Sequence, residues 1–213
     1  MNVLVTGFEP FGGEKINPAQ EVLRLLPDEL GGATIGALTL ATANGRADRQ
    51  LAQAVADFKP DVILSIGQAG GRSEITVERI AINVDDYRIP DNEGHQPIDQ
   101  PIAAAGPAAY FLTVPIKAMV HALREEGIPA SVSNSAGTYL CNHIAYVAAH
   151  MAAQSEKPMR SGFIHIPFLP EQAAGKNGMP SMSLELITRG ICRAIEVAVT
   201  RTQDLNETGG CIS

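Results

Sequence analysis

The chain has 213 residues, of which 45% are hydrophobic and 18% charged, an ordinary composition that excludes an intrinsically disordered protein. Its net charge of -7 disfavours nucleic acid or an anionic membrane as a partner, because both require clustered cations. Three cysteines without the spacing of a disulfide framework favour a reducing compartment. The first residues lack the pattern of a signal peptide, and no apolar run is long enough to span a bilayer, so we expect a cytoplasmic protein.

Strand-like apolar runs alternate with helix-like periodic segments along the chain. In order, the patterns predict a strand at 2–6, a helix at 17–26, a strand at 33–42, a helix at 45–58, strands at 61–67, 75–84 and 110–114, a helix at 116–125, a strand at 130–133, a helix at 138–154, a strand at 162–166 and a helix at 184–199. A polar segment at 85–101, rich in Pro, Asp and Gly, predicts a long surface loop of the kind that is often functional.

This alternation predicts an α/β fold, a single-domain three-layer αβα sandwich over residues 1–213. The run at 61–67 is nearly all apolar, as in a mostly parallel sheet covered on both faces. The segment 75–84 alternates instead, which indicates a mixed sheet. The polar tail from about residue 203 is expected to fray.

A possible nucleophile lies in the segment Asn134 to His143. Small residues after a strand form a tight loop, and the helix that follows places Cys141 in its first turn. Helix N-terminal N–H groups favour an anion there, so we expect the thiol to form a thiolate readily. The alternative is that Cys141 is one more small buried residue, as most free cysteines are.

A thiolate nucleophile requires a base, and His165 is the best placed of five histidines because it ends a strand that borders the expected ligand crevice. His143 is two positions from Cys141 and faces away from it on the helix. Glu78, a charged residue inside an otherwise apolar strand, is the candidate that orients the imidazole. Each also has a structural interpretation: His165 as a core histidine, and Glu78 as the partner of Arg79 or a solvated side chain. No Cys or His spacing indicates a metal site.

The loop GFEPFGG follows the first strand but lacks the spacing of a dinucleotide fingerprint. Its aromatic residues Phe8 and Phe11 suit a flat apolar ligand better than a phosphate, although both rings could simply pack the loop. Two other functions therefore remain open: a nucleoside phosphorylase-like enzyme of similar architecture, and a non-enzymatic small-molecule binding module.

Four stretches together resemble pyroglutamyl peptidase I, a family of cysteine exopeptidases. They are GFEPFGG with Asn17-Pro18, GQAGGRSEITVERIAIN, SNSAGTYLCN and GFIHIPFLP, and they cover nearly the whole chain in the family's order. The resemblance implies a catalytic triad of Glu78, Cys141 and His165. It also implies removal of N-terminal 5-oxoproline from peptides through a thioester, with no cofactor or metal.

The resemblance further implies roles for residues around the triad. Arg88 matches an arginine proposed to stabilise the oxyanion, and the residues implied to bind substrate are Phe8, Phe11, Asn17, Gln68 and Tyr139. Tyr139 stands where a phenylalanine is common in the family. The resemblance also implies a homo-oligomer, a tetramer in many bacterial relatives, whereas the tail with Cys211 has no counterpart.

Overall fold

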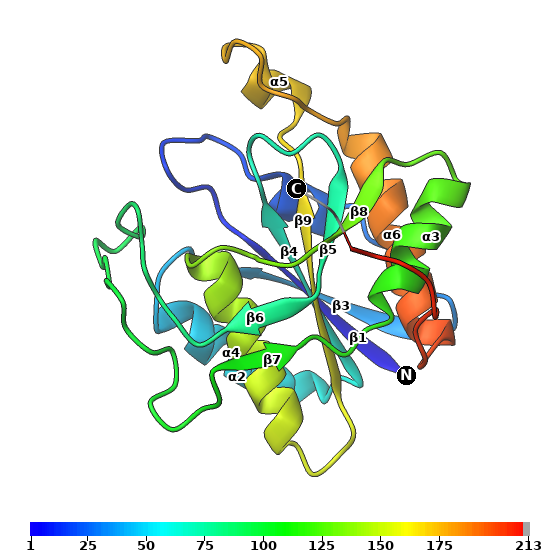
Figure 1. The fold of residues 1–213 in the computed structure, drawn as a ribbon, viewed down its shortest axis with the longest axis horizontal. Helices are drawn as coiled ribbons and strands as arrows, with labels where there is room; N and C mark the ends of the chain where they lie inside the picture. Colours follow the sequence, from blue (N-terminus) through cyan, green and yellow to red (C-terminus); the bar gives the residue numbers. More distant parts are fainter. Residues whose placement is uncertain (211–213) are drawn as a thin grey trace.

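The computed structural model describes residues 1–210, and a seven-stranded sheet forms its centre (Figure 1). The strands are β1 (Asn2–Phe8), β2 (Glu29–Leu30), β3 (Ala33–Leu40), β4 (Val62–Gln68), β5 (Ile75–Glu78), β8 (Ala130–Ser133) and β9 (Arg160–Ile166). They lie in the order β2-β3-β1-β4-β9-β5-β8. Strands β3, β1, β4 and β9 are parallel to one another, while β5 runs antiparallel to β9 and parallel to β8. The expected mixed, mostly parallel sheet is confirmed.

Helices cover both faces of this sheet, which confirms the three-layer arrangement (Figure 1). They are α1 (Pro18–Leu23), α2 (Arg46–Phe58), α3 (Ile116–Glu125), α4 (Leu140–Gln154), α5 (Pro170–Ala173) and α6 (Leu184–Thr200). Apolar side chains of α1, α3 and α6 share one buried cluster with the sheet, and those of α2 and α4 share the other. Each layer therefore buries one apolar stripe against the sheet.

The segment expected as one strand at 75–84 is instead two strands in two sheets. After β5 the chain turns at Arg79, and β6 (Ile80–Ile82) pairs with β7 (Ala109–Phe111) as a separate antiparallel hairpin. The buried Asn142 side chain explains the turn, because its amide accepts from the N–H of Ile82 and donates to the carbonyls of Ile82 and Val84. These bonds fasten β6 to α4. The strand expected at 110–114 is correspondingly displaced to β7.

The C-terminal tail also differs from expectation, because residues 204–209 are held against α3 rather than frayed. The Asp204 carboxylate accepts from the backbone N–H groups of Lys117 and Ala118, which are otherwise unsatisfied at the start of α3. Leu205 packs on the apolar cluster of that face. Cys211 lies outside the described residues. Within residues 1–210, no helix has the length and hydrophobicity of a membrane span.

Candidate functional site

The expected nucleophile lies at the end of the sheet where β4 and β9 finish. The helix α4 starts at Leu140, two residues later than predicted, so Cys141 is its second residue and lies in the first turn as expected. Its sulfur rests against Gly67 of β4 so closely that a Cβ added to Gly67 would lie 2.8 Å from Sγ. The absence of a side chain at Gly67 is what lets the thiol reach the sheet.

His165 and Glu78 reach the same place through the pairing of their strands. His165 is the register partner of Gly67 across β4 and β9, so its side chain leaves the sheet beside the thiol. Because β5 is antiparallel to β9, Thr76 lies opposite His165, and Glu78 is two residues further on the same face. The imidazole Nδ1 is 2.7 Å from Glu78 Oε1. The three residues expected from the sequence are thus brought together from α4, β9 and β5.

A fourth residue, Arg72, was not anticipated from the sequence. Its Nη1 donates to Glu78 Oε1 over 2.8 Å and to the Thr76 hydroxyl, and its Nη2 donates to the Ser135 carbonyl over 3.2 Å. The suggested partner of Glu78, Arg79, points elsewhere. It donates to the Asn134 side chain at 2.7 Å and to the Gly209 carbonyl of the tail at 3.0 Å. Arg72 is therefore the cation that faces the buried carboxylate.

Charge in this cluster resides on Glu78 and Arg72. Glu78 is 0% exposed, and burial raises its pKa, but His165, Ser133 and Arg72 together bring that pKa below its ordinary value, so the carboxylate is ionised. Burial lowers the pKa of His165 despite the adjacent carboxylate, which leaves a neutral imidazole. Burial, with the charge of Glu78, raises the pKa of Cys141 to about 12. The expectation of a readily formed thiolate is wrong for the resting protein, because burial outweighs the helix N-terminus.

His143, as expected, does not join this cluster. It is buried between Asp85 and Asp48, with Nδ1 2.8 Å from Asp85 Oδ2 and Nε2 2.8 Å from Asp48 Oδ1. Burial lowers the pKa of His143, but the two carboxylates overcome this and raise it to about 9. A protonated His143 therefore ties α4 to α2 and to the start of the 85–101 loop.

A cavity of about 330 Å³ lies at the end of β4, where Gln68 lines it, and neither Cys141, His165 nor Glu78 is part of its lining. Three of the residues expected to meet substrate line it, namely Phe11, Gln68 and Arg88. Its other walls come from the 85–101 loop and from the segment after β9, with lining residues Gly12, Glu14, Gly70, Ile89, Phe168, Lys176 and Met179. Aromatic and aliphatic walls with a few polar groups are typical of a pocket for a small flat ligand.

The other three expected substrate residues do not line this cavity. Phe8 is 2% exposed and packs in the apolar cluster that contains Cys141, because it lies within β1 rather than in the loop. Asn17 caps α1, accepting from the Ala19 N–H and donating to the Glu9 carbonyl. Tyr139 stacks near Phe11, with ring centroids 5.8 Å apart. Of the three, Tyr139 therefore contacts a residue of the cavity lining, Phe11.

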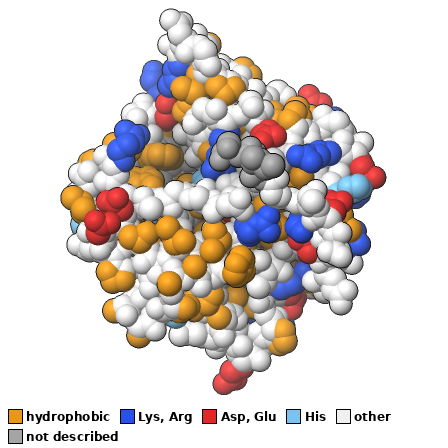
Figure 2. Space-filling view, in the orientation of Figure 1, with side chains coloured by type: hydrophobic (Ala, Val, Ile, Leu, Met, Phe, Trp, Pro, Cys, Tyr) orange, Lys and Arg blue, Asp and Glu red, His pale blue; other side chains and the backbone are white. Residues whose placement is uncertain are grey.

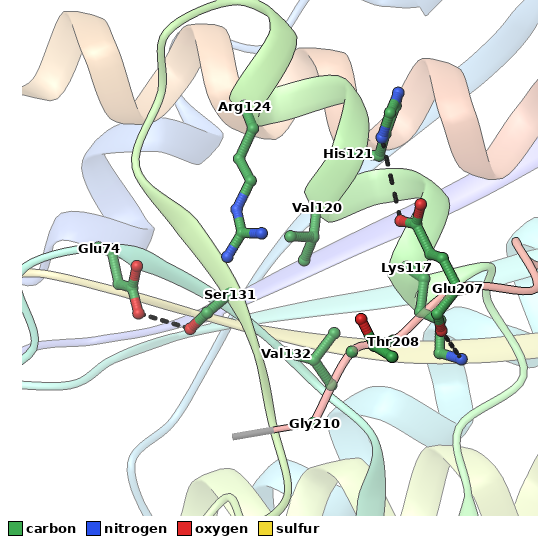
Figure 3. A pocket seen from close by; sticks show the side chains of 11 residues that line it. Glu74, Lys117, Val120, His121, Arg124, Ser131, Val132, Glu207, Thr208 and Gly210 are labelled. Carbon is green, nitrogen blue, oxygen red and sulfur yellow. Dashed lines mark hydrogen bonds and ion pairs between the residues drawn. The ribbon is translucent and has the colours of Figure 1, made fainter. Parts of the chain in front are cut away.

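A second cavity, of about 580 Å³, lies away from the cysteine, between α3, β8 and the tail (Figure 3). Its polar groups are largely engaged with one another: Glu74 accepts from the Ser131 hydroxyl at 2.5 Å, and Lys117 Nζ donates to the Glu207 carbonyl at 2.6 Å. Its lining, among the residues described, contains no cysteine. Likewise, residues 1–210 present no group of three or more His, Cys, Asp or Glu side chains that could hold a metal ion.

Comparison with known proteins agrees with the site at Cys141. A family model described as pyroglutamyl peptidase matches residues 1–201. A pyrrolidone-carboxylate peptidase of Treponema denticola is 56% identical over 216 residues, covering 100% of both chains, and one of Finegoldia magna is 54% identical, covering 99% of both.

Solved structures agree with these sequence matches. The pyroglutamyl peptidase I of Bacillus amyloliquefaciens is 43% identical with a TM-score of 0.94, covering 97% of this chain and 99% of that one. A mutant pyrrolidone carboxyl peptidase of Pyrococcus furiosus is 47% identical with a TM-score of 0.91, covering 93% and 98%. The likeness therefore extends over the whole fold and includes the region of the cysteine.

Proposed function

Since this chain belongs to the pyroglutamyl peptidase family, it is a hydrolase that removes N-terminal pyroglutamate, and we propose that Cys141, His165 and Glu78 are its catalytic residues. The observation that carries this assignment is the 2.7 Å bond between His165 and Glu78 beside a thiol that rests on Gly67. Nucleophile, base and orienting carboxylate then occupy one end of the sheet.

Cys141 and His165 are both neutral in the resting protein, and this determines how the reaction begins. Because burial keeps the proton on Cys141, the thiol gives that proton to His165 as its sulfur bonds to the pyroglutamyl carbonyl carbon. Glu78, ionised and bonded to Nδ1, stabilises the imidazolium that forms. His165 next protonates the departing amine as the C–N bond breaks, leaving a thioester. Water, deprotonated by His165, then attacks the thioester and releases 5-oxoproline and the free thiol.

The charge that develops on the carbonyl oxygen requires donors. We assign this role to the Cys141 backbone N–H, at the start of α4, and to Arg88 from the 85–101 loop. The lactam ring occupies the cavity lined by Phe11 and Gln68. Phe8, Asn17 and Tyr139 support that cavity. The mechanism requires neither metal nor cofactor.

We also propose that residues 1–213 form one catalytic domain, because both apolar clusters pack on one sheet. A cytoplasmic location is supported by Cys141 and Cys192, which are free thiols.

We further propose a homo-oligomer, a tetramer by family resemblance. It is supported by the Phe111 side chain on β7, which is 71% exposed. Figure 2 shows apolar side chains gathered on that face of the molecule. Light scattering of the purified protein measures the assembly directly.

The function is tested by release of a fluorophore from pyroglutamyl and prolyl amides, with and without iodoacetamide. We expect cleavage of the pyroglutamyl amide alone, abolished by alkylation. A proline ring lacks the lactam carbonyl and carries a charged amine, and sites built around a hydrogen-bonding group can reject such analogues by about 10⁴ to 10⁵. A ratio of kcat/KM below about 10² would contradict the pocket assignment. Dependence on phosphate, or indifference to alkylation, would favour a phosphorylase.

A further inference from the structure

We propose that Gln172, a residue of the short helix α5, sets the selectivity for a ring that carries a carbonyl by fixing which end of the Gln68 amide faces the cavity. The inference rests on the proposed function, because it concerns recognition of the lactam. Gln172 is 6% exposed and does not line this cavity, but it lines an adjoining one of about 530 Å³ that shares Gly12, Glu14 and Lys176 with it. We assign it a role through Gln68, as a positioning residue.

The orientation of the Gln172 amide follows from its backbone neighbours. Its Oε1 is 3.0 Å from the Leu169 N–H, which can only donate. Its Nε2 is 3.3 Å from the Ile16 carbonyl, which can only accept, and 3.2 Å from Glu14 Oε2. Because these groups have fixed roles, the oxygen and the nitrogen of Gln172 are not interchangeable.

Gln68 is oriented in turn. Gln172 Nε2 lies 2.8 Å from the Gln68 side-chain oxygen, and because a donor must meet an acceptor, that position of Gln68 is its carbonyl. The Gln68 amide nitrogen takes no part in this bond to Gln172. Among residues 1–210 it has no hydrogen-bond acceptor, and Gln68 lines the cavity. The cavity is thus provided with an N–H donor, held in place from behind.

An N–H donor at this position matches one substrate ring and not another. The lactam of pyroglutamate presents a carbonyl oxygen, which accepts from the Gln68 N–H. A prolyl ring has a CH2 group where the lactam has its carbonyl, so the Gln68 N–H would be left without an acceptor. Gln68 directly follows Gly67, on which Cys141 Sγ rests, so the cavity and the nucleophile adjoin the same end of β4.

The test reverses the polarity of residue 172 rather than merely removing it. In a Gln172→Glu variant the carboxylate still accepts from Leu169, but its second oxygen faces three acceptors, the Ile16 carbonyl, the Glu14 carboxylate and the Gln68 oxygen, and of these only the Gln68 amide can turn to present a donor. The Gln68 amide then turns its oxygen toward the cavity, against the lactam carbonyl. We expect kcat/KM for the pyroglutamyl amide to fall on the order of 10²-fold, mainly through KM, while activity on the prolyl amide does not fall. Gln172→Met, which frees Gln68 without inverting it, should lose less.

Two further variants separate this role from damage to the fold. In a Gln68→Met background, adding Gln172→Glu should change the pyroglutamyl-to-prolyl ratio less than twofold, because the two residues act as a unit. Gln53→Glu, an exposed change on α2, adds the same charge away from the cavity and should keep the ratio.

The outcomes also separate this inference from the proposed function. Wild-type protein inactive on pyroglutamyl amides would refute the proposed function. Active wild type with an unchanged ratio in Gln172→Glu, or additive effects in the double variant, would overturn the role of Gln172 alone.

Discussion

The buried pairing of His143 with Asp48 and Asp85 predicts a specific loss of stability at alkaline pH. Folding raises the pKa of His143 from its ordinary 6.5 to about 9. Between these two values the folded protein binds a proton that the unfolded chain has released. The stabilisation is therefore complete below pH 6.5 and is lost as the pH rises through 9.

The size of the loss follows from the same pair of values. One pKa unit corresponds to about 1.4 kcal/mol, so a rise from 6.5 to about 9 corresponds to about 3 kcal/mol of unfolding free energy. No discount for solvent screening applies, because the His143 side chain is only 4% exposed. Removing the cation also leaves the buried Asp85 carboxylate without its ion-pair partner at every pH.

Urea unfolding at pH 6 and pH 10 measures this difference, with His143→Gln compared with the wild type. We expect the wild type to lose about 3 kcal/mol more than the variant between the two pH values. His121→Gln serves as the control, since His121 is half-exposed on α3 and should leave the pH dependence unchanged. Equal pH dependence in the wild type and His143→Gln would refute the reasoning.

Three further predictions concern the thiol. Cys141→Ala should abolish hydrolysis while Cys192→Ala keeps most of it, and comparable loss in both, measured by fluorophore release, would mean that the nucleophile is misassigned. Gly67→Ala should reduce kcat on the order of 10²-fold, because the new Cβ would lie 2.8 Å from both Cys141 Sγ and the Phe163 ring. Gly175→Ala, where the new Cβ meets open space, is the control and should not reduce kcat. Equal activity of the two variants would contradict the close contact of Cys141 with Gly67. With a thiol pKa of about 12, inactivation by iodoacetamide should rise about tenfold per pH unit from pH 7 to 9. A plateau before pH 8 would instead indicate a resting ion pair with His165.

Sequence patterns predicted the parts of this molecule that depend on local order. Apolar runs such as Val62–Gln68 and periodic helices such as Leu184–Thr200 were found within one or two residues, because burial on a sheet or a helix face leaves a regular pattern. Glu78 and His165 stood out because a charged or titratable side chain interrupts an apolar strand. Their mutual contact, however, depends on the reversed direction of β5, which no local pattern specifies.

The missed features share a dependence on tertiary contacts. Arg72 sits in a glycine-rich loop without a periodic pattern, and its contact with Glu78 depends on how that loop folds back along β5. Gln172 belongs to a helix of four residues, too short for a periodic pattern. The raised pKa of Cys141 comes from the depth of burial, whereas the sequence displayed only the helix start that opposes it.

The described part of the tail contacts a residue that adjoins Glu78 in the chain. The family model ends at residue 201, yet the Gly209 carbonyl holds Arg79, which follows Glu78 in the chain and bonds to Asn134 in the loop before Cys141. For protein engineering, a fusion partner joined to this tail would act on a segment that bonds to Arg79, next to Glu78 in the chain, and would therefore disturb more than the surface.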